Sequence, residues 1–365
     1  MTETARYSGV DRLLHRLAFG GVPLQRALAD MEDRLFASSL DREASDRPVF
    51  IAGLPRAGTT HLLNILARSE ELATNSYRDM PFVLAPLLWD RFSRPFRKSA
   101  ALQERPHGDG VAVGFDSPEA FEEAVWLMFW PQKYHGNRID LWTAGDRDPE
   151  FEAFFAQHMC KVAALRASGD DRPTARRYLS KNNANIARLR LLPTLFPNCR
   201  ILVPFREPLS HTLSLQSQHR RFQRIHAEDP FARRYMAALG HFEFGADLKP
   251  IAFGSTFGSP NAPAFWLRYW IAAHEFFETE SSSSVVFVDY ADLCKCPERT
   301  TLLLSDTIDI ELSEAMRGVA LATHPPRDYQ VPKDQDFETL LPRAQAIYER
   351  LRHKAGAAFL PTAGH

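Results

Sequence analysis

Residues 47–69 read RPVFIAGLPRAGTTHLLNILARS, and this stretch decides the fold. The apolar run Arg47–Ala52 predicts a buried strand, Gly53–Thr60 predicts a turn, and His61–Ser69 has the apolar spacing of a helix. A glycine-rich turn between a strand and a helix directs backbone N–H groups to one point, where the helix dipole also favours negative charge. The stretch therefore predicts an α/β protein with a phosphate-binding loop.

The loop GLPRAGTT differs from the Walker phosphate-binding motif at one decisive position. Gly53 and Gly58 have the spacing of that motif, but Thr59 stands where the motif requires lysine, and Arg56 is the nearby cation. The apolar run that ends in Asp289 is typical of a strand that presents a magnesium-binding aspartate. A P-loop kinase or NTPase therefore stays open as an alternative.

Further strands and helices alternate along the chain. A helix is predicted over Ala184–Phe196, a buried strand over Arg200–Phe205 and a helix from Pro208 onward. Later, Val285–Asp289 predicts another buried strand and Pro297–Ile308 another helix. This alternation predicts a three-layer α/β/α fold with a central parallel sheet and helices on both faces.

The chain contains no Pro-, Gly- or Ser-rich linker that separates two patterns, so residues 1–365 are predicted to form one domain. We expect a helical preface over 1–46, broken near Gly20 and Pro23, a core over 48–310 and a C-terminal extension over 311–365. The core holds a helical insertion at about 80–178. In such folds ligands bind beyond the carboxyl ends of the strands. We therefore expect this insertion to form the pocket for an acceptor substrate, or a lid over it.

Composition excludes several classes of function. The 365 residues are 45% hydrophobic with a formal net charge of -1, which gives no electrostatic indication of a nucleic-acid partner. Four cysteines without a C-x-x-C pair favour neither a disulfide scaffold nor a zinc site. No stretch approaches the ~18 apolar residues of a membrane span, so we expect a cytoplasmic protein.

A second polar motif follows the strand at 200–205. Arg206 ends the strand and Ser214 lies eight residues later. Pro208 suits the first position of a helix, which places Ser214 about two turns along it. An arginine at a strand end is more often part of a surface ion pair, but together with a nearby hydroxyl it suits a second phosphate.

Four motifs occur in an order that resembles one enzyme family. They are GLPRAGTT at 53–60, LSKN at 179–182, FREPLSHTLS at 205–214 and VVFVDYADLCKCPERT at 285–300. Together they resemble the PAPS-dependent sulfotransferases, with spacing more similar to the tyrosylprotein and broad bacterial branches. The resemblance implies a P-loop-like fold that transfers a sulfonate from PAPS to a hydroxyl or amine acceptor, giving PAP, without a metal.

The resemblance also implies roles for individual residues. Lys181 matches the position of the catalytic lysine, Arg206 and Ser214 match the 3'-phosphate site, and His61 stands where relatives contact the adenine. The residues expected to hold the 5'-phosphosulfate are Arg56, Ala57, Gly58, Thr59 and Thr60. Arg56 and Lys181 are expected to neutralise charge on the leaving phosphate.

The general base has two candidates. Asp79 lies a little over twenty residues after Arg56, where the resembling branch carries a carboxylate; a helix cap or an ion pair with Arg78 is its alternative interpretation. In another branch the base is a histidine on a later loop, and His107 is then the candidate. The acceptor and the oligomeric state stay open, as does a non-catalytic PAP-binding module.

Two further clusters are interpreted as structural. The acidic cluster Glu119, Glu122 and Glu123 has no histidine at ligand spacing and fits the first turn of a helix. Aromatic and small side chains recur at helical spacing between 265 and 277, which favours a core face over an acceptor pocket. The residues of this stripe are Phe265, Trp266, Tyr269, Trp270, Ala273 and Phe277.

Overall fold

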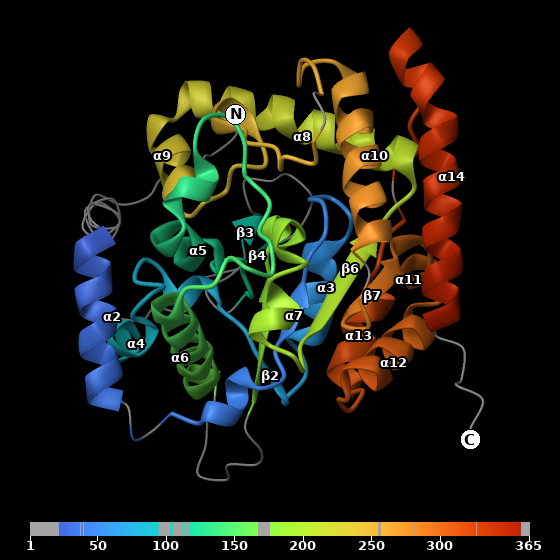
Figure 1. The fold of residues 1–365 in the computed structure, drawn as a ribbon. Coiled ribbons are helices and arrows are strands. Elements are labelled where there is room, and N and C mark those ends of the chain that lie inside the picture. Colours follow the sequence, from blue (N-terminus) through green and yellow to red (C-terminus); the bar gives the residue numbers. More distant parts are fainter. Residues whose placement is uncertain are drawn as a thin grey trace.

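A five-stranded parallel sheet forms the centre of the computed structural model, in the order β2-β5-β1-β6-β7 (Figure 1). The strands are β1 (Val49–Ile51), β2 (Leu72–Ala73), β5 (Arg177–Lys181), β6 (Arg200–Phe205) and β7 (Val285–Asp289). The structure describes residues 22–36, 38, 40–94, 103–104, 112–113, 117–166, 176–254, 257–280, 282–325 and 327–358. A separate antiparallel pair consists of β3 (Gln103–Glu104) and β4 (Ala112–Val113).

Alternate residues of the strands pack into two cores, one on each face of the sheet. Val49, Ile51 and Leu202 contact one core, to which α3, α12 and α13 contribute. Phe50 and Val203 contact the larger core on the opposite face, which α6, α10 and α14 cover. The fold is therefore the predicted three-layer arrangement, because each strand buries both of its faces.

The helices have the following bounds. Around the sheet lie α2 (Val22–Phe36), α3 (Thr59–Leu66), α4 (Pro86–Ser93), α5 (Glu123–Phe129), α6 (Pro149–Arg166), α7 (Leu192–Leu195), α8 (Pro208–Glu228), α9 (Pro230–Ala238), α10 (Pro263–Thr279), α11 (Tyr290–Lys295), α12 (Pro297–Ile308), α13 (Glu314–Leu321) and α14 (Gln335–Ala358). Short 3-10 helices are η2 (Arg42–Ser45), η3 (Tyr77–Asp79), η5 (Pro131–Tyr134), η6 (Asn183–Arg188) and η7 (Gly245–Asp247). The long helices α10 and α14 run side by side (Figure 1).

Most of the predicted elements are present. The strands β6 and β7, the start of α8 and the whole of α12 coincide with the predictions, whereas β1 is shorter and α3 begins two residues earlier. The single helix predicted over 184–196 is wrong, because η6 and α7 divide it. Pro193 lacks the N–H that a continuous helix needs there, and Asn182 caps the shorter η6 by accepting from the Ala184 amide.

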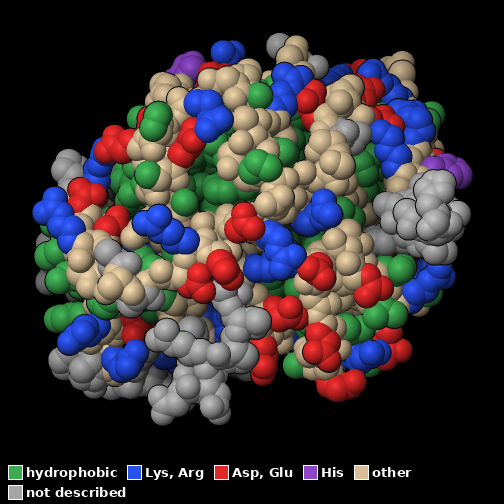
Figure 2. All heavy atoms as spheres, turned by 60° about the horizontal axis from the view of Figure 1, so that its bottom comes forward, with side chains coloured by type: hydrophobic (Ala, Val, Ile, Leu, Met, Phe, Trp, Pro, Cys, Tyr) green, Lys and Arg blue, Asp and Glu red, His purple; other side chains and the backbone are tan. Residues whose placement is uncertain are grey.

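The described part of the preface begins with α2 at Val22, next to the predicted break at Pro23. The division into preface, core and extension stays a prediction. Figure 2 shows basic and acidic side chains interspersed over one face of the molecule, consistent with the near-neutral net charge. Among the helices that the structure describes, none has the length and apolar character needed to cross a membrane.

Candidate active site

The loop after β1 is held in a strained and closely packed conformation. Arg56 has a φ of 69°, a left-handed conformation that costs a residue with a side chain about 1–2 kcal/mol. A methyl group on Gly53 would lie 2.9 Å from the Pro204 carbonyl oxygen, and one on Gly58 would lie 2.4 Å from the Tyr290 ring. Both glycines are therefore required, and strain of this kind is concentrated at functional sites.

The loop leads directly into the amino end of α3. The first backbone bond within this helix runs from the Leu62 amide to the Gly58 carbonyl. The amides of Thr59, Thr60 and His61 come before it and have no acceptor inside the helix, so they form the positive end of the helix dipole. This is the geometry that binds a phosphate or sulfate group.

His61 turns toward the segment that follows α13. Its Nε2 lies 2.5 Å from the Thr323 hydroxyl, and burial lowers the pKa of the imidazole, as does the nearby His324. In the same segment the His324 carbonyl accepts from the Tyr290 hydroxyl over 2.9 Å. The segment after α13 therefore closes one side of the loop, which the sequence did not indicate. Contact of His61 with an adenine stays a prediction.

Arg206 and Ser214 lie beside this loop. Arg56 Nε donates to the Ser214 hydroxyl over 3.3 Å, and Arg206 donates to the Arg56 carbonyl over 3.4 Å. Arg206 also donates to Ser210, one helical turn before Ser214. Burial lowers the pKa of Arg206, and repulsion from the Arg56 charge adds to this effect. Within the described residues no carboxylate forms an ion pair with Arg206, so an anion would relieve this repulsion.

A buried histidine on α8 fixes the position of the loop. His211 Nδ1 accepts from the Trp270 indole over 3.1 Å, so Nε2 carries the proton and donates to the Pro55 carbonyl at 2.8 Å. Burial lowers the pKa of His211 well below its usual value, as does the Arg206 charge, so the ring stays neutral. Sequence reasoning missed His211 and Ser210, although the i, i+4 spacing from Ser214 could have indicated Ser210.

Lys181 lies on the other side of the loop. It is the last residue of β5, it is paired in register with Ile51 of β1, and 8% of its surface is exposed. The next residue, Asn182, donates its backbone N–H to the Ile51 carbonyl. In the sheet β1 lies between β5 and β6. The loop after β1 therefore lies between Lys181 at the end of β5 and Arg206, which follows β6. The structure thus brings together, at the carboxyl ends of the strands, the residues that are predicted to bind the nucleotide and Lys181.

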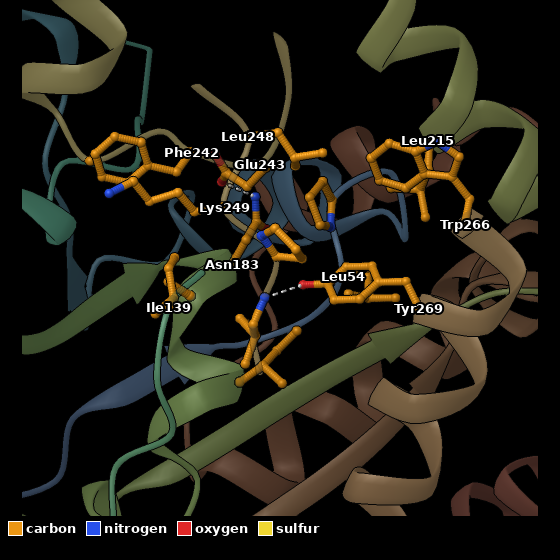
Figure 3. A pocket seen from close by; sticks show the side chains of 16 residues that line it. Leu54, Ile139, Asn183, Leu215, Phe242, Glu243, Leu248, Lys249, Trp266 and Tyr269 are labelled. Carbon is orange, nitrogen blue, oxygen red and sulfur yellow. Dashed lines mark hydrogen bonds between the residues drawn. The ribbon is translucent and has the colours of Figure 1, made fainter. Parts of the chain in front are cut away.

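A pocket opens beside the loop (Figure 3). Leu54 and Pro55 of the loop form one part of its wall, and the rest comes mainly from the segment 240–251 and from η6, α8 and α10. All six residues of the predicted core stripe are buried in the larger core, so the interpretation of the stripe as a core face is correct. Two of them, Trp266 and Tyr269, also line the pocket.

One carboxylate belongs to the described lining of this pocket. Glu243 accepts from the Asn183 amide over 2.9 Å and forms an ion pair with His241 at 3.8 Å (Figure 3). Burial raises the pKa of Glu243, but His241, Lys181 and Asn183 outweigh burial and lower it to about 2. Glu243 is therefore ionised at neutral pH. No motif contains this residue, so the sequence alone did not reveal it.

Asp79 lies in a different, tightly bonded environment. One of its oxygens accepts from the Ser76 amide at 2.8 Å, from Asn75 at 3.3 Å and from Arg166 at 2.6 Å. Asp79 thus closes a capping box at η3, and 3% of its surface is exposed. A structural role in a cap and an ion pair therefore agrees with these contacts, but the ion-pair partner is Arg166 and not the predicted Arg78, and the N-cap residue is Ser76. The role of Asp79 as base stays a prediction, and His107 lies outside the described residues.

Glu122 and Glu123 belong to a buried polar network at the start of α5. Arg188 forms two bonds to Glu123, at 2.8 and 2.9 Å, and its guanidinium lies between the rings of Trp126 and Trp142. Asn182 donates to Glu123 over 2.6 Å. The interpretation of this cluster as structural agrees with these contacts, and the network anchors the residue next to Lys181.

Asp289 also has a structural environment. It caps α11 by accepting from the Ala291 amide, and it accepts from Tyr348 and Arg352 of α14 at 3.0 to 3.2 Å. A carboxylate with these hydrogen bonds differs from one that is positioned to coordinate a magnesium ion. Among the described side chains, no group of three or more His, Cys, Asp or Glu residues could hold a metal ion.

Comparison with known proteins agrees with the fold and the loop. The model of the sulfotransferase family matches residues 48–314, so the chain belongs to the sulfotransferase family. No functionally curated protein shows significant sequence similarity to the chain.

Solved structures of bacterial sulfotransferases are similar to this one. Sulfotransferase STF9 from Mycobacterium avium has a TM-score of 0.50 at 14% identity, covering 96% of this chain and 87% of that chain. Sulfotransferase STF1 from Mycobacterium tuberculosis H37Rv has a TM-score of 0.47 at 13% identity, covering 96% and 88%. At these identities the likeness to STF9 supports the fold, and the assignment to a particular branch stays a prediction.

Proposed function

We propose that this protein transfers the sulfonate of PAPS to a hydroxyl or amine acceptor, releasing PAP and a sulfated product. The observation that carries this proposal is the cluster of Arg56, Arg206 and Ser214 around a loop that leads into the amino end of α3. Arg206 is buried and Arg56 is half-buried beside it, and PAPS carries two anionic groups on one nucleotide that suit such a pair of cations. Membership of the sulfotransferase family supports the same reaction.

In this proposal the loop residues Arg56–Thr60 hold the 5'-phosphosulfate, and Arg206 with Ser214 holds the 3'-phosphate. The acceptor oxygen forms a bond to sulfur while the bond from sulfur to the 5'-phosphate oxygen breaks, and the electron pair of that bond stays on the phosphate. Arg56, Lys181 and the α3 amides neutralise this charge, so the transfer needs no metal. Preorganised charge of this kind often contributes more to catalysis than any other single effect.

Two alternatives are less well supported. A P-loop kinase would need a magnesium-binding aspartate, and Asp289 is instead bonded to α11 and α14. A non-catalytic PAP-binding module would have no use for Lys181, yet Lys181 lies at the end of β5 next to the loop.

Thermal unfolding with and without nucleotide tests the proposal. PAP should raise the Tm in the presence of EDTA, because a ligand at 100 times its Kd stabilises the folded state by about 2.7 kcal/mol. AMP, which lacks the 3'-phosphate, is the matched control and should give a smaller shift. A shift with ATP and magnesium but none with millimolar PAP would contradict the proposal. Release of PAP from PAPS in the presence of an acceptor distinguishes an enzyme from a binding module.

A further inference from the structure

The pocket beside the donor loop has mostly apolar walls. Leu215, Phe242 and Ile251 are buried side chains among the sixteen residues that line it. The polar ends of its aromatic residues are engaged elsewhere: the Trp266 indole donates to Pro260, and the Tyr269 hydroxyl accepts from the Ile251 amide. The rings of these two buried residues therefore form part of the apolar wall of the pocket.

Two charged residues, Glu243 and Lys249, are among the described residues that line the pocket. The Lys249 ammonium donates to the Tyr134 carbonyl and lies 5.1 Å from the Phe242 ring centre. Glu243 keeps 23% of its side chain exposed, accepts a hydrogen bond from Asn183 and is paired with His241 at 3.8 Å. An ionised carboxylate offers about four acceptor sites, so Glu243 retains capacity to accept from a hydroxyl.

Glu243 also lies on the side of the pocket where transfer would occur. Asn183, which donates to Glu243, lies two residues after Lys181, and Lys181 is paired with Ile51, two residues before the loop. Leu54 and Pro55 of that loop belong to the same pocket wall. A hydroxyl that bonds to Glu243 would therefore lie close to the lysine and to the loop that holds the donor.

Resting on the proposed function, we propose that the acceptor is a phenol or alcohol on a compact apolar body, and that Glu243 takes its hydroxyl proton. The acceptor O–H bond breaks and its proton passes to a Glu243 carboxylate oxygen while the oxygen forms its bond to sulfur. The bond from sulfur to the 5'-phosphate breaks, and Glu243 returns the proton to solvent after the product leaves. An apolar acceptor excludes water from the pocket, and this increases the proton affinity of the carboxylate at the moment of transfer.

The test uses the full-length protein with PAPS and a series of phenols of differing acidity: 4-nitrophenol, 4-chlorophenol, phenol and 2-naphthol. Glu243→Gln keeps the shape and the contact with Asn183 but removes the proton acceptor. It should lower kcat by ~10²–10⁴ for phenol, and by less for 4-nitrophenol, which sheds its proton more readily. The shift in Tm with PAP should persist. Glu349→Gln, on the exposed face of α14, is the matched control and should keep full activity.

A second variant tests the pocket itself without touching the carboxylate. Leu248→Trp places a larger side chain at a half-exposed position of the lining. It should raise KM for 2-naphthol at least tenfold and leave the shift in Tm with PAP unchanged. Full kcat in Glu243→Gln across the series would overturn the role of Glu243. A wild-type protein that binds PAP but sulfates none of these phenols would overturn the acceptor class alone. Failure to bind PAP would overturn the proposed function instead.

Discussion

Arg56 Nε donates to the Ser214 hydroxyl over 3.3 Å, and this bond joins the loop after β1 to the second turn of α8. The two residues are 158 positions apart in the chain. Since Arg206 donates to the Arg56 carbonyl, the sites expected for the 5'-phosphosulfate and the 3'-phosphate share one polar cluster. The effect of a substitution in this cluster on affinity can therefore be compared between nucleotides that have the 3'-phosphate and nucleotides that lack it.

Arg206→Ala should weaken PAP far more than AMP. A hydrogen bond to a charged group contributes about 1.5–3 kcal/mol, and AMP has no 3'-phosphate with which to make it. The Kd for PAP should therefore rise by about 10- to 150-fold, while the Kd for AMP changes little. Isothermal titration with both nucleotides measures this difference, and equal losses would show that Arg206 does not bind the 3'-phosphate.

Lys181→Ala should lower kcat by on the order of 10²-fold or more, while the Kd for PAP stays within a few-fold. The reason is that a preorganised cation contributes most when charge develops on the leaving phosphate. Steady-state rates with PAPS and a phenol, together with PAP titration, separate the two quantities. An equal rise in KM with unchanged kcat would indicate that Lys181 contributes to ground-state binding only.

Asp79→Asn distinguishes a structural carboxylate from a catalytic one. If its bonds to Ser76 and Arg166 are structural, the variant should lose about 1–3 kcal/mol of stability, because the ion pair between the buried carboxylate and the half-buried Arg166 is lost. Its kcat, measured well below its Tm, should then stay near the wild-type value. A loss of ~10²–10⁴ in kcat with an unchanged Tm would instead identify Asp79 as the base. His107→Ala, assayed in parallel, tests the other candidate from the sequence.

The ion pair of His241 and Glu243 should give stability a distinct dependence on pH. Burial lowers the pKa of His241, but Glu243 outweighs burial and raises it above its usual value of 6.5; the folded pKa of Glu243 is about 2, below its usual 4.5. A raised histidine pKa stabilises below about pH 6.5, and a lowered carboxylate pKa stabilises above about pH 4.5.

The difference in Tm between the wild type and Glu243→Gln should therefore be largest at about pH 4.5–6.5. It should shrink as pH falls through the folded pKa of Glu243 and as pH rises through that of His241. The groups facing Glu243 in the structure are His241, Lys181 and Asn183. A difference that is constant over pH 3–8 would show that the pair does not titrate with folding.

Local patterns in the sequence were sufficient to predict much of the fold. The strands β6 and β7 and the helix α12 coincide with their predictions because apolar runs and helix-starting prolines act over a few residues. The helix predicted over 184–196 is divided because Pro193 lacks a backbone N–H, and because Asn185 and Arg188 bond to Glu122 and Glu123, some sixty residues earlier in the chain. Such distant partners leave no local pattern.

The sequence by itself determined the loop between β1 and α3, since glycine spacing, an arginine and paired threonines lie within eight residues. It also determined that Ser214 lies about two turns along the helix that follows Arg206, because a helix has a fixed period. Only the tertiary structure decided that Glu243 lines a pocket with Leu54 and that Asp79 is bonded to Arg166. The physical reason is that the environment of a carboxylate depends on which distant segments pack against it, and parallel strands joined by long connections bring such segments together without a short-range signal.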